Sequence, residues 1–269
     1  MKITVLSDNN SCGELLNEWG LSFWIETGGK KLLMDTGASD VFHQNAIQLG
    51  IRIEEADAVI LSHAHHDHGG GLPEFFETNR TAPAYIREGS GENCWHRKEG
   101  ELGYVGIPQG VLENYSDRIR YVSGVTEIMP GVLIVPHTPS LDMQDPDDPY
   151  LLILEEDGFR PDDFRHEQSL VIETEAGAVI FSSCSHTGPR NITADVRKAI
   201  PNAKIRAFIG GLHIYQWTAE QVKNLAEEIA AAGIEKVYTG HCTGEAFEFL
   251  KENLGEAAEQ FYAGMVIRL

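Results

Sequence analysis

The segment Ser62–Gly70 constrains this chain more than any other, because it places four imidazoles and a carboxylate directly after an apolar run. The run is Ala58–Leu61, and the segment reads Ser-His-Ala-His-His-Asp-His-Gly-Gly. Neutral imidazole and carboxylate are ligands that zinc, iron and manganese accept in proteins. The segment therefore predicts a metal site at the end of a β-strand. Its mixed, internal composition argues against a repetitive histidine tract or a purification tag.

The chain is long enough for one sizeable core, since it has 269 residues of which 42% are hydrophobic. We expect a single domain over residues 1–269. The opening apolar stretch Met1–Leu6 is too short for a signal peptide, and no run reaches the length of a membrane span. Four widely spaced cysteines favour reduced thiols over a disulfide framework. These features predict a cytoplasmic protein that does not act at a membrane.

The charge balance is strongly acidic, with 21 Lys and Arg against 41 Asp and Glu and a formal net charge of -20. Such a surface repels polyanions and lacks the basic footprint of nucleic-acid binders. We therefore expect a small-molecule substrate and no nucleic-acid partner. The oligomeric state stays open.

The chain reads as two similar halves, each with a hairpin, further strands and helices. The middle, residues 73–164, is rich in Gly, Pro, aromatic and acidic residues, including the acidic run 142–149. We interpret it as a loop-rich segment that decorates a sheet and forms a pocket wall. Strands are expected inside it at 83–87, 118–122, 132–135 and 150–154.

Four strand-like segments end in histidine: the cluster that begins at His63, then His186, His213 and His241. One histidine after a strand is more often structural than functional. Strand ends at one sheet edge converge on a common crevice, however, and here the pattern recurs beside glycine each time. The recurrence favours a shared multi-ligand site.

These residues resemble the metallo-β-lactamase superfamily, whose signature His-x-His-x-Asp-His is matched by His63, His65, Asp67 and His68. The resemblance covers most of the chain and implies a four-layer αβ/βα sandwich of two mixed β-sheets with helices on the outer faces. Further motifs resemble the subgroup of dihydropterin-methyl-ribofuranosylaminobenzene-phosphate synthase-like metal-dependent hydrolases; they include 8–10, 184–188, 210–213 and 239–244. Its substrate need not transfer.

The resemblance also implies the ligands. His63, His65 and His186 would hold a first metal, and Asp67, His68 and His241 a second. The expected metal is zinc, as one or two ions, with iron or manganese as alternatives.

One departure from the family pattern concerns the second metal. Many members place a bridging Asp after the strand that follows His186, but the only Asp between His186 and His241 is Asp195, inside a predicted helix. His213 stands nearest the expected position. Since imidazole does not usually bridge two cations, we expect a strong first site and a weaker second one, with His213 as ligand or proton shuttle.

The resemblance and the residue chemistry together predict a hydrolase that uses a metal-activated hydroxide on a small phosphorylated or ester-type substrate. Asp67 would orient the hydroxide, and Asp35 would fix ligand imidazoles from outside the coordination sphere. Candidate substrate contacts are His66, Arg97, Lys98, Arg190 and Trp217, each with a plain surface role as the alternative. Two other functions remain open. One is a non-hydrolytic metalloenzyme on this scaffold, such as a pterin-related synthase or an iron-dependent oxidoreductase, and the other is a metal-dependent sensor.

Overall fold

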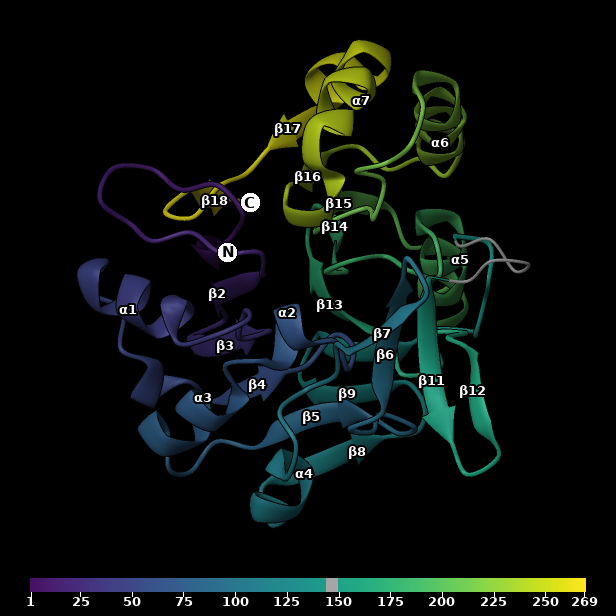
Figure 1. Cartoon of the computed structure of the whole chain (residues 1–269). Helices are drawn as coiled ribbons and strands as arrows, with labels where there is room; N and C mark the ends of the chain where they lie inside the picture. Colours follow the sequence, from purple (N-terminus) through teal and green to yellow (C-terminus); the bar gives the residue numbers. More distant parts are fainter. Residues whose placement is uncertain (144–149) are drawn as a thin grey trace.

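Two seven-stranded mixed sheets pack face to face in the computed structural model, which describes residues 1–143 and 150–269 (Figure 1). The first sheet comes mainly from the N-terminal half and is closed by the last strand of the chain. Its order is β18 (Val266–Arg268), β1 (Lys2–Ser7), β2 (Ser22–Thr27), β3 (Lys30–Met34), β4 (Ala58–Ile60), β5 (Ala84–Arg87) and β8 (Ile119–Val122).

The second sheet repeats this design with the C-terminal half. Its order is β17 (Ala258–Gln260), β16 (Val237–Thr239), β15 (Ile205–Ile209), β14 (Gly177–Phe181), β13 (Gln168–Thr174), β10 (Val132–Pro136) and β9 (Thr126–Met129). In both sheets an antiparallel set leads into parallel strands, so several strands end at the same edge.

The middle of the chain is more regular than its composition suggests. It supplies strands to both large sheets and forms a separate four-stranded sheet: β12 (Gly158–Pro161), β11 (Leu151–Glu155), β6 (Cys94–Lys98) and β7 (Glu101–Tyr104). The four strands expected there are present as β5, β8, β10 and β11. Residues 144–149 of the predicted pocket wall, most of the acidic run, lie outside the described residues.

Helices cover the outer faces of the two large sheets (Figure 1). Beside the first sheet lie α1 (Val41–Gln48), α2 (His66–Gly69), α3 (Leu72–Thr78) and α4 (Val111–Asn114), and beside the second α5 (Pro189–Ala199), α6 (Ala219–Ala231) and α7 (Phe247–Leu254). Short 3-10 turns span Ile53–Glu55, His241–Ala246 and Gly255–Ala257. A capping box of Thr218 and Gln221 opens α6, and α1 begins after its N-cap residue Asp40.

Strand alternation explains the layers. Phe23 and Ile25 of β2 point into the core between the sheets, whereas Trp24 points toward the outer helices. In β14, Phe181 faces the same inner core and Ile180 faces α5 and α6. A strand with apolar residues on both faces must be covered on both sides. The order helix, sheet, sheet, helix follows, which confirms the predicted four-layer sandwich.

Gly210 occupies a turn that admits no side chain, where β15 leads toward His213. Its φ is +146°, and an added Cβ would lie 1.9 Å from the carbonyl oxygen of Ser182. We expect Gly210→Ala to lower the free energy of unfolding by about 3 kcal/mol, because the backbone of a buried strand end would have to move. The matched change Gly124→Ala, where a Cβ meets nothing within 4 Å, should stay within about 0.5 kcal/mol. Equal chemical denaturation midpoints for the two variants would contradict this view of the turn.

Among the described residues, no helix combines the length and the apolar character needed to cross a membrane.

Candidate metal centre

The first cluster consists of three buried imidazoles from two strand ends. His63 and His65 follow β4, and His186 follows β14. Their ring centroids are 4.6 Å (His63–His65), 4.9 Å (His63–His186) and 4.9 Å (His65–His186) apart. Nε2 of His63 and both ring nitrogens of His186 are buried without a hydrogen-bond partner among the described residues. The structure therefore brings together the three side chains predicted to hold a first metal.

The second cluster lies beside the first and joins Asp67, His68 and His241. Oδ2 of Asp67 lies 3.2 Å from Nε2 of His241 and 3.8 Å from Nε2 of His68. The rings of His63 and His68 are 4.2 Å apart, so the two clusters are adjacent. Cys184 belongs to this group as well, with its Sγ 3.1 Å from Nε2 of His68.

Asp35 fixes the loop that carries the signature. Its fully buried carboxylate accepts hydrogen bonds from the Ser62 amide (2.7 Å), from the Ser62 hydroxyl (2.7 Å) and from Nδ1 of His68 (2.8 Å). The Ser62 hydroxyl in turn lies 2.8 Å from Nδ1 of His63 and can accept a hydrogen bond from an N–H at that nitrogen. Both imidazoles are thereby oriented with Nε2 toward the clusters, which is the outer role predicted for Asp35.

The other imidazoles are oriented by residues that the sequence interpretation did not single out for this role. Oδ1 of Asn9 lies 2.9 Å from Nδ1 of His241, and Asp8 accepts the His241 amide at 2.7 Å. Asp162 lies 3.4 Å from Nε2 of His65. Asn9 and Asp8 belong to a motif that supported the family resemblance, but nothing in their spacing indicates which histidine they contact.

The loop that carries His186 is held by a buried carboxylate and an aromatic ring. Glu167 accepts hydrogen bonds from the amides of His186 and Thr187, both at 2.8 Å, and from the Thr187 hydroxyl at 2.7 Å. Phe164 stacks on His186 with ring centroids 4.4 Å apart. His166 is buried and accepts the Ala64 amide at Nδ1.

Backbone strain gathers at this centre. Among the described residues, seven non-glycine residues have positive φ, and five of them surround the two clusters. Positive φ costs free energy for side chains with a Cβ, so its concentration here marks a functional site. The five are Asp35 (57°), Phe164 (55°), Ser185 (59°), His213 (51°) and His241 (46°).

His213 reaches the first cluster, with its ring centroid 4.4 Å from that of His186. It is half-buried, and its Nδ1 is without a hydrogen-bond partner among the described residues. This placement suits either of its predicted roles, ligand or proton shuttle.

In the absence of metal, the buried histidines fall into two groups, one with lowered and one with raised pKa values. Burial, reinforced by neighbouring imidazoles, holds the pKa of His63 and of His186 well below the usual range. Burial opposes protonation of His65 and His241 too, but Asp162 beside the first, and Cys242 and Asp67 beside the second, raise the pKa of each to about 9.

The contribution of these four histidines to the stability of the metal-free protein should therefore peak near pH 6.5. Below about pH 6.5 the unfolded chain protonates the equivalents of His63 and His186 while the folded chain does not, so stability falls with falling pH. Above it, the stability that protonated His65 and His241 contribute is lost as the pH rises through about 9. Chemical denaturation of metal-free protein across this range checks the prediction. A steady increase in stability up to pH 9 would contradict it.

A cavity of about 360 Å³ opens onto both clusters. Its wall is largely aromatic, with Trp19, Tyr150 and Tyr215 beside the histidines. Trp19 is 51% exposed and donates from Nε1 to Oδ2 of Asp67 at 3.1 Å. The tryptophan therefore belongs to the cavity wall, where it fixes the carboxylate. Nothing in the sequence around Trp19 indicates this contact with Asp67.

The predicted substrate contacts are scattered. His66 lines the metal-facing cavity, whereas Arg190 and Trp217 line a neighbouring cavity of about 380 Å³. Arg97 and Lys98 are exposed on β6 and line neither cavity.

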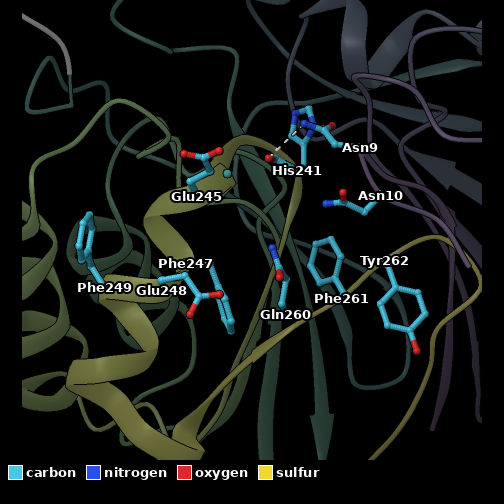
Figure 2. A pocket seen from close by; sticks show the side chains of 11 residues that line it. Asn9, Asn10, His241, Glu245, Phe247, Glu248, Phe249, Gln260, Phe261 and Tyr262 are labelled. Carbon is cyan, nitrogen blue, oxygen red and sulfur yellow. Dashed lines mark hydrogen bonds between the residues drawn. The ribbon is translucent and has the colours of Figure 1, made fainter.

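A larger cavity, of about 730 Å³, lies near His241 and is drawn in Figure 2. Asn9 and His241 stand at one end of it, and Glu245, Glu248 and Gln260 line the rest with Phe247 and Tyr262. Of the two metal clusters, it reaches only His241. The cavity of about 360 Å³ is therefore the one that gives access to the metal centre, although the cavity near His241 is larger.

The donor set fits a metal ion. Buried polar nitrogens without partners are costly, and here they belong to imidazoles that converge from separate strand ends. Their opposite nitrogens contact residues that set the ring orientation, as ligand histidines require. His63, His65 and His186 would hold a first ion, and Asp67, His68 and His241 contribute to a second group.

Comparisons with known proteins agree with this geometry. A 7,8-dihydropterin-6-methyl-4-(beta-D-ribofuranosyl)-aminobenzene-5'-phosphate synthase from Methanocaldococcus jannaschii is 29% identical over 269 residues, which cover 94% of this chain and 90% of that protein. The crystal structure of Tm1679, described as a metal-dependent hydrolase of the beta-lactamase superfamily, matches with a TM-score of 0.84 and 27% identity, over 100% of this chain and 99% of that one.

Zinc-bound PqqB from Methylobacterium extorquens shares the fold, with a TM-score of 0.60 at 14% identity over 100% of both chains. A family model described as "Metallo-beta-lactamase superfamily" matches residues 20–241, which is most of the chain. The match contains the signature loop after β4 and the histidines that follow β14 and β16, and this chain is a member of the metallo-β-lactamase superfamily.

Proposed function

We propose that this protein is a metal-dependent hydrolase that acts on a small ester or phosphoester, with zinc as its metal. The observation that carries the proposal is the set of unpaired, buried imidazole nitrogens of His63 and His186, which converge with His65 beside an open cavity. The likeness to Tm1679 over the whole chain supports hydrolysis as the reaction class.

Each residue near the cavity has a separate task in this proposal. A bound metal ion would lower the pKa of water from about 15.7 toward about 7 and so make a nucleophile available at neutral pH. Asp67, held by Trp19, accepts a hydrogen bond from the attacking water and so orients it. His213 presents an unpaired Nδ1 beside His186 and hands a proton to the leaving oxygen.

The cavity wall favours a compact substrate with a flat or apolar portion. Trp19, Tyr150 and Tyr215 offer ring surfaces, and the lining among the described residues contains no Lys or Arg. An anionic group on the substrate would therefore depend on the metal for its charge partner. A small-molecule substrate, rather than a nucleic acid or a membrane, remains our expectation.

The test is a substrate panel with metal-free and reconstituted protein. Phosphodiester, phosphomonoester, thioester and lactone substrates are offered after chelation and after addition of zinc, manganese or iron(II). We expect hydrolysis of at least one class that disappears on chelation and returns with metal. Metal-loaded protein that hydrolyses none of the four classes would overturn the proposal.

The named synthase gives a second candidate. Because it aligns with 94% of this chain, a bond-forming reaction on a pterin-related substrate deserves the same assay, with product identified by mass spectrometry. Product that forms without net hydrolysis would favour the synthase, and hydrolysis alone would favour our first proposal.

A further inference from the structure

The second cluster lacks the bridging carboxylate that many members of the superfamily carry. Among the described residues, the group around His68 and His241 contains one carboxylate, that of Asp67. A divalent ion held by one carboxylate and two neutral imidazoles keeps a net positive charge, which is why the sequence predicts a weak second site. The fourth member of the group is Cys184.

The loop after β14 reaches both clusters within three residues. Cys184 places its Sγ in the second cluster, and His186 places its imidazole in the first. Ser185 between them has a φ of +59°, and its hydroxyl turns away to donate to the carbonyl of Gly211 at 2.8 Å. This kinked backbone directs both neighbours toward the metal centre. The Cys184 thiol is therefore positioned by the same turn that positions His186, an expected ligand.

The distances lie within about half an ångström of those in a tetrahedral site. With zinc at about 2.0–2.1 Å from nitrogen or oxygen and about 2.3 Å from sulfur, tetrahedral ligand atoms lie about 3.3 Å apart for two light atoms and about 3.6 Å apart for sulfur and nitrogen. The observed separations are 3.1 Å (Cys184 Sγ to His68 Nε2), 3.2 Å (Asp67 Oδ2 to His241 Nε2) and 3.8 Å (Asp67 Oδ2 to His68 Nε2). All four ligand atoms lie within 4.8 Å of one another.

We propose that Cys184 is a thiolate ligand of the second metal ion and supplies the negative charge that the absent bridging Asp provides elsewhere in the superfamily. With Asp67, the thiolate brings two negative charges to a divalent ion and so neutralises it. The proposal rests on the metal centre of the proposed function. It replaces the expectation of a weak second site with that of a second site as complete as the first.

Cys242 acts as a positioning residue for this thiolate. Its Sγ lies 3.2 Å from that of Cys184, and it accepts the amide of His213 at 3.2 Å. The Cys242 Sγ also lies 4.0 Å from the carbonyl oxygen of Cys184, to which its thiol can donate. Its Sγ is not within the group that contains Asp67, His68 and His241, so we expect it to tune the ligand without binding this ion.

X-ray absorption of the zinc-loaded wild-type protein tests the proposal without any substitution. We expect two zinc ions per chain and, on average, half a sulfur neighbour per zinc. Two zinc ions with only nitrogen and oxygen neighbours would overturn the assignment of Cys184 while leaving the proposed function intact. A protein that binds no zinc at all would overturn both.

Cobalt(II) titration of the reduced, metal-free protein assigns the sulfur to a residue. The wild type should gain a near-ultraviolet thiolate-to-cobalt absorption band that belongs to one of two bound equivalents. Cys184→Ser should lose this band and bind one equivalent more than about 100-fold more weakly, since loss of a ligand exceeds the loss of an outer contact. Unchanged binding of the other cobalt(II) equivalent would show that the Cys184→Ser variant is folded.

Two matched variants complete the test. Cys242→Ser and the exposed Cys12→Ser should both keep the band. Cys184→Asp, which restores a carboxylate, should keep two cobalt equivalents and lose the band. A band that survives in Cys184→Ser but vanishes in Cys242→Ser would assign the ligand to Cys242 and contradict the proposal.

Discussion

Replacing His186 by alanine is expected to abolish the stabilisation that the first zinc ion gives this protein and, with it, metal-dependent turnover. His186 contributes buried nitrogens without partners among the described residues, so its imidazole gains its full interaction only when a metal is bound. Removal of one of three ligands should weaken metal binding by more than the roughly 10–100-fold that loss of an outer contact costs. In wild type, zinc at about 100 times the dissociation constant of a site should add about 2.7 kcal/mol per site to the free energy of unfolding. The variant should keep the contribution of the second site and gain almost nothing from the first.

The metal-free variant should fold. His186→Ala loses the stacking contact with Phe164 but also removes buried nitrogens that cost free energy when unpaired. The control is His43→Ala on α1, where the imidazole contacts Glu74 away from the centre. Zinc should stabilise this control as it does wild type. A zinc-dependent rise in melting temperature as large in His186→Ala as in wild type would contradict the proposed first site.

The second large effect is expected from Asp35→Asn, a nearly isosteric change that leaves every proposed ligand in place. Oδ2 of Asp35 lies 2.7 Å from the Ser62 hydroxyl and 2.8 Å from Nδ1 of His68, so an amide nitrogen there would face a ring N–H donor. The imidazole would have to turn or change its tautomer. We expect about 10–100-fold weaker metal binding, together with about 1–3 kcal/mol lower stability from the unpaired buried donor.

Calorimetric zinc titration and chemical denaturation measure both effects. The control Asp117→Asn changes an exposed carboxylate and should alter neither. If Asp35→Asn lost stability but kept wild-type zinc affinity, Asp35 would be a purely structural residue, and its proposed influence on His68 would be wrong.

The sequence predicts those features that depend on local spacing. The apolar run before His63, the turn glycines and the alternation in β2 and β14 each leave a pattern over a few residues, so strands and the convergence of their ends could be inferred. The four-layer sandwich was expected from the resemblance to the metallo-β-lactamase superfamily. The six ligands expected from the resemblance also belong to short motifs. Their places at strand ends made it possible to expect that they meet.

Contacts between distant segments could not be read in the same way. Asn9 contacts His241 across 232 positions, and Asp162 approaches His65 across 97. Cys184 is a small residue at a strand end, and its sulfur points toward the second cluster because the backbone is kinked at Ser185. Trp19 precedes a buried strand and reads as core, yet its loop carries it to Asp67. Such placements depend on the packing of two halves that no short pattern encodes.

The central claim is that imidazoles from distant segments share one metal ion. Its most direct test is anomalous X-ray scattering from crystals of protein purified without added metal and then soaked in zinc. We predict a peak bounded by His63, His65 and His186, and a second peak among Asp67, His68, Cys184 and His241. Crystals that show well-ordered imidazoles at these positions and no anomalous peak between them, even in excess zinc, would contradict the account.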